Sequence, residues 1–379
     1  MTDVDLVNVS LEVIRSGQTP TGAFVASPTF SQYGYSWLRD GAFIADSLRL
    51  AGEAAAASRF HVWVASVVHA SAPGIERSIV AVRAGDRPLA TDYLHCRYTT
   101  NGSAGPDDWP TFQLDGPGIW LWSLGRHAAG NRLSGSLLDA ALRVGHYLAA
   151  LWPVPSSDAW EEFPDEIHTS TLAAELAGLR ALLALSPEAR AEPTILVAAA
   201  SIESRLRNQG RAVGAWTKWT GSNAVDASLL WIAVPYGLVP VHEGRFAATL
   251  ARVEAELVSA DGGVHRYAAD TYYGGGEWLL LTASLGRVYA RRNGPGDRAR
   301  ALRCLTWIEA QAASDGGLPE QVATDALHPE GIDEWRVMWG ESACPLLWSH
   351  ATYLALRAEL GLPTANPRTN TAGAEIVGA

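Results

Sequence analysis

The sequence predicts an all-α protein whose paired helices close into an α/α barrel. Three observations lead to this fold class. Apolar residues spaced i, i+3 and i+4, the mark of amphipathic helices, recur in about a dozen windows. Short β-branched runs such as 79–82 lack the turn signals of hairpins. No alternation of strands and helices indicates a doubly wound sheet.

The expected helices follow this periodicity and are joined by turns. They span residues 4–15, 41–52, 53–70, 75–83, 118–129, 134–151, 169–185, 191–207, 225–234, 244–258, 277–291, 297–313 and 342–360. Four long segments rich in Gly, Pro, Asp or Trp interrupt them, at 85–114, 152–168, 261–276 and 315–340. Long loops in a compact domain are usually functional, so we expect these four to meet at one mouth of the barrel.

The chain has 379 residues, of which residues 1–362 are predicted to form a single barrel domain. No Pro- and Ser-rich linker divides it. The segment 363–379 is polar and composed of small residues, so we expect a loose C-terminal tail.

Composition excludes several classes of protein. The net charge is −11, Lys218 is the only lysine, and the arginines are scattered, so no nucleic-acid surface is expected. No apolar run reaches the ~18 residues of a transmembrane helix. The N-terminus has no signal-peptide pattern, which predicts a cytoplasmic protein. The sequence does not indicate an oligomeric state.

No metal or cofactor is expected. Cys96, Cys304 and Cys344 form no C-x-x-C pair, which argues against a zinc site or disulfide framework; Cys304, in an apolar helical pattern, is expected to be buried. The sequence contains no H-E-x-x-H motif and no P-loop. The aspartates Asp107, Asp108 and Asp115 do not match a calcium-binding loop.

Tryptophan is the compositional outlier, with 15 copies beside 11 tyrosines. Such residues often provide flat faces for sugar rings. An aromatic-rich core is the alternative, and composition alone favours that alternative.

The first candidate for catalysis is the cluster Asp158-Ala-Trp160-Glu161-Glu162. Crowded carboxylates repel one another, and a carboxyl against an indole loses solvation. Both effects raise a pKa and favour a protonated acid near neutral pH. A solvated acidic loop is the alternative, which the embedded aromatics and flanking prolines weaken.

The second candidate is Glu320, in the turn Asp315-Gly-Gly-Leu-Pro-Glu320-Gln321. A Gly-Gly-x-Pro turn projects one carboxylate in a defined direction. Alone it is a common surface turn. Together with the first cluster it supplies the second carboxylate that glycoside hydrolysis requires.

Three further motifs combine aromatic and polar residues. Tyr33-Gly-Tyr-Ser-Trp37-Leu-Arg39-Asp40 offers an Arg–Asp pair suited to vicinal hydroxyls, although Asp40 could instead cap the following helix. The motifs Trp109-Pro-Thr-Phe-Gln113-Leu-Asp115-Gly116 and Arg266-Tyr-Ala-Ala-Asp270-Thr-Tyr272-Tyr273-Gly-Gly-Gly-Glu277-Trp278 could contact sugars or simply pack as loops.

Taken in order, these motifs resemble the glucoamylase-type catalytic domain of glycoside hydrolase family 15. The series is Y-x-x-x-W-x-R-D, W-x-x-x-Q-x-D-G, D-x-W-E-E, R-Y-x-x-D-T-Y-Y, P-E-Q and W-S, spanning about residues 31–356. The resemblance implies an (α/α)6 barrel of six helix hairpins with inner and outer rings. It also implies an inverting exo-glucosidase that releases β-glucose from non-reducing ends.

The resemblance also implies roles for individual residues. Glu161 corresponds to the general acid and Glu320 to the general base. Arg39 and Asp40 resemble the pair that holds the hydroxyls of the terminal glucose. The remaining implied substrate-binding residues are Tyr33, Trp37, Trp109, Asp158, Trp160, Glu162, Arg266 and Tyr272.

The chain departs from the fungal family pattern at Thr111, Phe112 and His350, which leaves the reaction unchanged and bears on linkage preference. A cytoplasmic enzyme would meet a small oligosaccharide, so we expect isomaltose-type α-1,6 links first, α-1,4 maltosides second and trehalose third. The alternatives from other classes are a non-catalytic carbohydrate-binding protein with a degenerate barrel and a glycoside phosphorylase. Phosphorolysis would need an anion pocket in place of Glu320.

Overall fold

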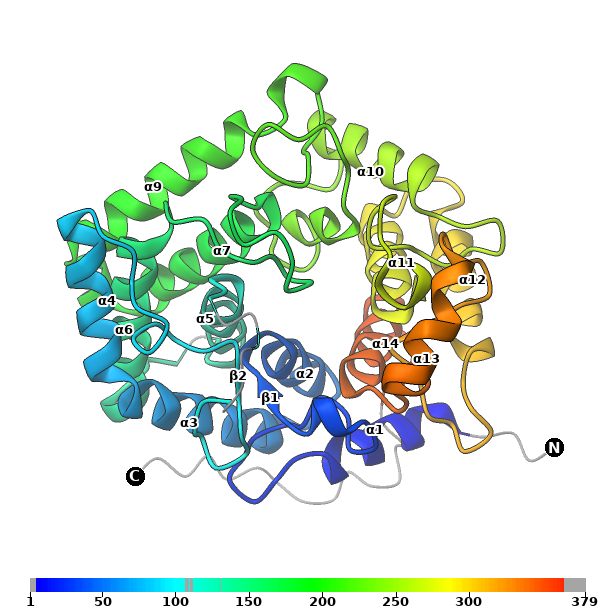
Figure 1. Cartoon of the computed structure of the whole chain (residues 1–379), viewed down its shortest axis with the longest axis horizontal. Helices are drawn as coiled ribbons and strands as arrows, with labels where there is room; N and C mark the ends of the chain where they lie inside the picture. The colour runs from blue at the N-terminus through cyan, green and yellow to red at the C-terminus, as the bar shows by residue number, and fades with distance from the viewer. Residues whose placement is uncertain (1–4, 106–108, 110–111, 130, 365–379) are drawn as a thin grey trace.

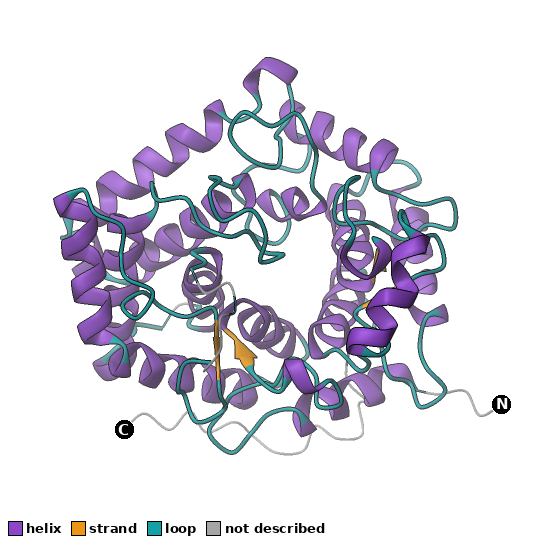
Figure 2. Cartoon of the chain, viewed as in Figure 1, coloured by secondary structure: helices purple, strands orange, loops and turns teal. Residues whose placement is uncertain are grey.

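Two concentric rings of helices form the protein. The computed structural model describes residues 5–105, 109, 112–129 and 131–364, and Figure 1 looks along the axis of the rings. Helices make up nearly all of the regular structure, as Figure 2 shows. Of the predicted tail at 363–379, residues 365–379 lie outside the described residues.

The inner ring contains six elements, and each packs against the next. In order around the ring they are α2 (Leu38–Leu50), α5 (Asp115–His127), α7 (Thr169–Leu185), the 3-10 helix η3 (Ala227–Ile232), α11 (Leu279–Arg292) and α14 (Leu347–Glu359). Contact between α14 and α2 closes the ring. Because these elements touch both the barrel centre and the outer helices, most of their residues are buried.

The outer ring contains six amphipathic helices, each with one buried face. They are α1 (Leu6–Ser16), α3 (Ala54–Ala70), α6 (Gly135–Leu151), α9 (Pro193–Asn208), α10 (Gly244–Glu256) and α12 (Asp297–Ala310). Six inner and six outer elements make an (α/α)6 barrel, which confirms the predicted fold. Three further helices lie outside this plan: α4 (Ala72–Ala84), α8 (Pro187–Arg190) and α13 (Ile332–Trp339).

The structure corrects several expected elements. Helix α14 begins at Leu347, five residues after the predicted start at residue 342. The segment 225–234 forms only the short η3, because Pro235 follows it and disfavours helical geometry in the residue before. Helix α2 begins at Leu38, three residues before the predicted start, so Asp40 lies in its first turn and Trp37 takes the N-cap position. Helix α13 lies within the predicted loop 315–340.

Two short antiparallel ladders join long loops to the starts of inner helices. Strand β1 (Ser36–Trp37), directly before α2, pairs with β2 (Arg97–Tyr98). Strand β3 (Glu277–Trp278), directly before α11, pairs with β4 (Gln321–Val322). Residues 277 and 278 were expected to be helical, so this is a correction. The ladders bring the loops 85–114 and 315–340 to the same end of the barrel, as predicted.

Among the helices that the structure describes, none has both the length and the apolar character to cross a bilayer. Cys304 is buried, as its helical pattern predicted.

Glycines allow the inner helices α5 and α7 to approach with their backbones in contact. A Cβ added at Gly118 would lie 2.7 Å from the carbonyl carbon of Ala174, and one at Gly178 would overlap the backbone oxygen of Gly118. Neither obstacle is a side-chain tip that could rotate away. Helices α5 and α7 therefore lie close together in the inner ring, and only glycine fits at positions 118 and 178.

We expect Gly178→Ala to destabilise the protein by about 3 kcal/mol, because overpacking against a backbone forces the two helices apart. Thermal unfolding followed by circular dichroism measures this loss. Gly244→Ala is the matched control: the glycine opens α10 with no atom within 4 Å of an added Cβ, so its melting temperature should stay within a degree or rise. Equal melting temperatures for the two variants would contradict the close-packing argument.

Candidate active site

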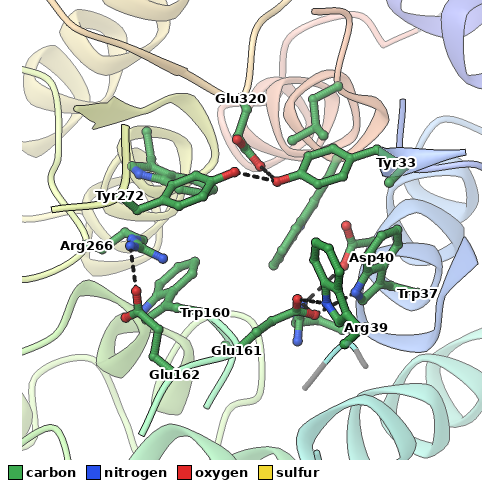
Figure 3. A pocket seen from close by; sticks show the side chains of 16 residues that line it. Tyr33, Trp37, Arg39, Asp40, Trp160, Glu161, Glu162, Arg266, Tyr272 and Glu320 are labelled. Atoms are coloured by element: carbon green, nitrogen blue, oxygen red, sulfur yellow. Dashed lines mark hydrogen bonds and ion pairs between the residues drawn. The ribbon is translucent and has the colours of Figure 1, made fainter. Parts of the chain in front are cut away.

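One pocket opens at the mouth where the long loops gather, with a cavity of about 270 Å³. Eleven of the twelve predicted site residues line it, from loops and helix starts far apart in the chain (Figure 3). They are Tyr33, Trp37, Arg39, Asp40, Trp109, Trp160, Glu161, Glu162, Arg266, Tyr272 and Glu320. The twelfth, Asp158, lies beneath the pocket and is buried. The loops that carry Trp160 and Glu320 therefore meet at one end of the barrel.

Glu161 is held by two indoles. The Nε1–H of Trp37 donates to its Oε1 at 2.6 Å, and that of Trp109 donates to its Oε2. The guanidinium of Arg39 lies 3.4 Å from Oε1. The backbone of Glu161 has a φ of 69°, the left-handed region that non-glycine residues rarely adopt. Such strain is typical of residues that a site must aim in one direction.

The indoles that contact Glu161 are not the one expected from the sequence cluster Asp158–Glu162. Trp160 was expected to lie against the neighbouring carboxyls and desolvate them. Its indole N–H instead donates to Asp226, while Trp37 and Trp109 contact Glu161. The guanidinium of Arg97 lies over the Trp109 ring at 3.8 Å and the Trp37 ring at 5.4 Å, so both indoles are themselves held in place.

Glu320 faces Glu161 across the cavity (Figure 3). The hydroxyl of Tyr33 donates to its Oε1 at 3.1 Å, and the hydroxyls of Tyr33 and Tyr272 are 2.8 Å apart. Burial is the main cause that raises the pKa of Glu320 to about 8; the Tyr33 hydrogen bond and Arg266 oppose it, and Asp40 and Glu161 add to it.

The Arg39–Asp40 pair lies in the first turn of α2. Arg39 Nη1 donates to Gln113 at 2.8 Å and lies 3.2 Å from Asp115. These two residues, expected as possible sugar contacts, therefore orient Arg39. Burial raises the pKa of Asp40 to about 6, against the opposing charge of Arg39 at 3.4 Å.

A second carboxylate–arginine group adjoins Glu161. Arg266 donates to Glu162 at 3.1 Å and to Asp270 at 2.7 Å, and the hydroxyl of Tyr267 donates to Glu162 at 2.6 Å. Burial raises the pKa of Glu162, opposed by Arg266 and by the Tyr267 hydrogen bond. Arg266 is buried and so presents its charge from a fixed position.

Tryptophans lie both in the wall of the pocket and in the aromatic core beneath it. Trp37, Trp109, Trp160, Trp278 and Trp348 line the pocket. Beneath them, Phe43 stacks on Trp348 at 5.1 Å and packs against Trp231 at 5.2 Å, so other aromatic rings fill the centre of the barrel. Trp278, which belongs to a motif expected at the mouth of the barrel, lines the pocket as predicted; Trp348, from the W-S motif, was not expected there.

Several buried polar atoms around the pocket have no hydrogen-bond partner among the described residues. They are Arg39 Nε, Asp40 Oδ2 and the indole nitrogens of Trp278 and Trp348. Arg39 Nε and Asp40 Oδ2 lie 3.4 Å apart and form an ion pair. Within the described part of the chain, no group of three or more His, Cys, Asp or Glu side chains could hold a metal ion.

The chain is similar to known proteins in sequence and in fold. The model of glycosyl hydrolases family 15 matches residues 6–343. The isomaltose glucohydrolase of Kribbella flavida is 45% identical over 362 residues, which are 94% of this chain and 93% of that protein. A glycosidase variant in complex with glucose is 44% identical, with a TM-score of 0.88 over 95% of this chain and 97% of that one.

At lower identity the likeness concerns the fold alone. A bacterial glucoamylase in complex with acarbose is 19% identical, with a TM-score of 0.69 over 94% of this chain and 56% of that one.

The raised pKa of Glu320 has a consequence for stability. The unfolded chain releases this proton near pH 4.5, whereas the folded chain keeps it to about pH 8. The native state is therefore penalised as the pH rises through this window. We expect Glu320→Gln to melt like the wild type at pH 4.5 and to be more stable at pH 8, by about 4 kcal/mol at most.

Calorimetry at the two pH values measures this difference. Glu334→Gln, which removes a carboxylate from the exposed surface of α13, controls for loss of charge. If the difference in stability between Glu320→Gln and the wild type is the same at both pH values, the Glu320 carboxyl is not protonated in the native protein.

Proposed function

The chain belongs to glycoside hydrolase family 15, and on this premise we propose that it is an inverting exo-acting α-glucosidase for short α-glucosides. It releases β-glucose from the non-reducing end, with isomaltose-type α-1,6 linkages preferred. The observation that carries the proposal is the pair of carboxyl groups, Glu161 and Glu320, facing each other across one aromatic-walled pocket.

In the proposed mechanism Glu161 is the general acid. It donates a proton to the glycosidic oxygen as the bond to the anomeric carbon breaks, so the leaving sugar departs as an alcohol. Glu320 is the general base, which removes a proton from a water molecule attacking the opposite face of the sugar. The hydroxyl of Tyr33, fixed by Tyr272, keeps the Glu320 carboxylate turned toward the cavity.

The other pocket residues hold the substrate. Arg39 and Asp40, which line the pocket as an ion pair, bind the hydroxyls of the terminal glucose. Trp37, Trp109 and Trp160 supply flat apolar faces for the ring, with Tyr33 and Tyr272 completing the wall.

Glu162 and Arg266 lie on the side of the acid, where the leaving-group sugar departs.

The preference for α-1,6 linkages rests on the isomaltose glucohydrolase that is 45% identical over nearly all of both chains. α-1,4 maltosides are the second proposed substrates and trehalose the third. A non-catalytic binding protein is disfavoured because both carboxyl groups are present and lie in one pocket. Phosphorolysis is disfavoured because it needs an anion pocket in place of a general base, and the carboxyl of Glu320 occupies that position; glucose release independent of phosphate tests this.

The two carboxyl groups should respond differently to the leaving group. We expect Glu161→Gln to lower kcat/KM on isomaltose by at least about 100-fold and to affect α-glucosyl fluoride much less, because fluoride departs without a proton. Glu320→Gln should damage both substrates, since both need activated water. Equal losses for both variants on both substrates would refute the assignment. A larger loss for Glu162→Gln than for Glu161→Gln on isomaltose would move the acid to Glu162.

Linkage and stereochemistry are tested together by proton NMR of the anomeric signals. An inverting site holds a water molecule between the base and the anomeric carbon, with carboxyl groups about 6.5–9.5 Å apart. We therefore expect β-glucose first from an α-linked substrate, before mutarotation. Across isomaltose, maltose, trehalose, isomaltotriose and kojibiose, kcat/KM should be highest for isomaltose. Early α-glucose would contradict inversion, and a faster reaction with maltose or trehalose would contradict the α-1,6 preference alone.

A further inference from the structure

Lys218 is the only lysine of the chain, and the proposed mechanism gives it no part. It lies in the connection between α9 and η3 and does not line the pocket. Only 3% of its surface is exposed. An isolated ammonium group is costly to bury, so its surroundings must compensate the charge.

Two buried carboxylates compensate it. The Nζ of Lys218 lies 2.8 Å from Asp158 Oδ2 and 2.5 Å from Asp226 Oδ2. Burial lowers the pKa of Lys218, but the two aspartates outweigh that effect and raise it, so the ammonium stays charged. The same atom lies 3.9 Å from the centre of the Tyr267 ring, a cation–π contact.

Both carboxylates hold the loop that carries the proposed general acid. Asp158 Oδ1 accepts hydrogen bonds from the backbone N–H groups of Trp160, at 2.9 Å, and Glu162, at 3.0 Å, the residues on either side of Glu161. Asp226 accepts the indole N–H of Trp160 at 3.0 Å. The loop is thus fixed at three points around Glu161.

The backbone at Glu161 needs this support. Its φ of 69° is sterically unfavourable for a residue with a Cβ, and Phe163 two residues on has a φ of 52°. Strained conformations persist only where the surrounding structure over-determines them. Without the ammonium, Asp158 and Asp226 would be two buried carboxylates with no cation between them, and their repulsion would move the loop.

We propose that Lys218 is a positioning residue for catalysis: by joining Asp158 to Asp226 it keeps the strained Glu161 loop in the geometry that protonates the leaving group. This role rests on the proposed function of Glu161 as the general acid. Lys218 acts through the two aspartates and touches neither the substrate nor the reacting atoms.

The decisive experiment compares Lys218→Met with the wild type on isomaltose and α-glucosyl fluoride. Methionine keeps most of the apolar stem and removes the charge. We expect kcat on isomaltose to fall by about 30-fold or more, because a small displacement of a catalytic group is costly. On α-glucosyl fluoride the loss should be less than about threefold, since fluoride needs no proton. The inhibition constant of glucose should be unchanged.

Two variants complete the design. Lys218→Arg keeps the charge but changes the geometry of its contacts. It should also lose more activity on isomaltose than on α-glucosyl fluoride, by a smaller factor than Lys218→Met. If Lys218→Met does not fold, Lys218→Arg tests the proposal. Arg287→Met removes another buried cation, which lies on α11 away from the pocket and contacts Glu359 of α14. It should lose stability while leaving the ratio of the two activities unchanged.

A loss shared equally by the two substrates would make Lys218 a merely structural residue and overturn the proposal, as would full activity of Lys218→Met. The control for the underlying function is Glu161→Gln. If that variant shows the imbalance and the Lys218 variants do not, the positioning role alone fails. If Glu161→Gln shows no imbalance, the assignment of the acid fails first.

Discussion

Arg39, Lys218 and Arg266 are buried cations at or beside the pocket, and each has at least one acceptor from a distant part of the chain. Arg39 is held by Gln113 and Asp115, and Lys218 by Asp158 and Asp226. Breaking one such pair leaves an uncompensated charge, which is far more costly than losing an exposed salt bridge. This requirement makes the loops interdependent, because the carboxylates from one loop are the partners of a cation from the next. The rigid pocket is a consequence of that pairing.

The barrel brings those loops together by presenting the starts of the inner helices at one end. Asp40 and Asp115 lie in the first turns of α2 and α5, and Trp348 lies in the first turn of α14. The N-terminal end of a helix carries a partial positive charge, which favours carboxylates there. Closing the ring therefore collects helix ends around one cavity and supplies part of the electrostatic environment. The two short ladders then fix the directions from which Trp37 and Trp278 enter it.

Much of this could be predicted from the sequence, and the misses have physical reasons. Periodicity located twelve of the thirteen expected helices, because apolar spacing reports burial directly. It failed at η3, where Pro235 overrides the pattern. It also placed Glu277 and Trp278 in a helix, because the pairing of two residues with a distant strand leaves no local signal.

At the site, the order of motifs identified residues that line the pocket. The motifs could not separate the residues that face the cavity from the residues that orient them by hydrogen bonds and ion pairs. The orienting residues are Gln113, Asp115, Asp158 and Asp270. That distinction depends on three-dimensional neighbours. Lys218 shows the limit most clearly: as the only lysine it was visible in the composition, but its partners are 60 and 8 residues away in the chain.

Among the carboxyl groups that line the pocket, Glu320 is the exception to the pairing of charges, and this suits a general base. It has one hydrogen bond, from the hydroxyl of Tyr33, and no salt bridge with a described residue, so burial raises its pKa to about 8. A carboxylate with a raised pKa holds a proton more strongly and is therefore the better base toward water once ionised. The positive charge that develops at the anomeric carbon in the transition state favours the ionised form, as any nearby opposite charge does. A permanent cation beside Glu320 would ionise it at all times and weaken it as a base. The charged residues proposed to bind the substrate are therefore held in ion pairs. Glu320, the proposed base, has no such pair, and the charge that develops on the reacting sugar favours its ionised form.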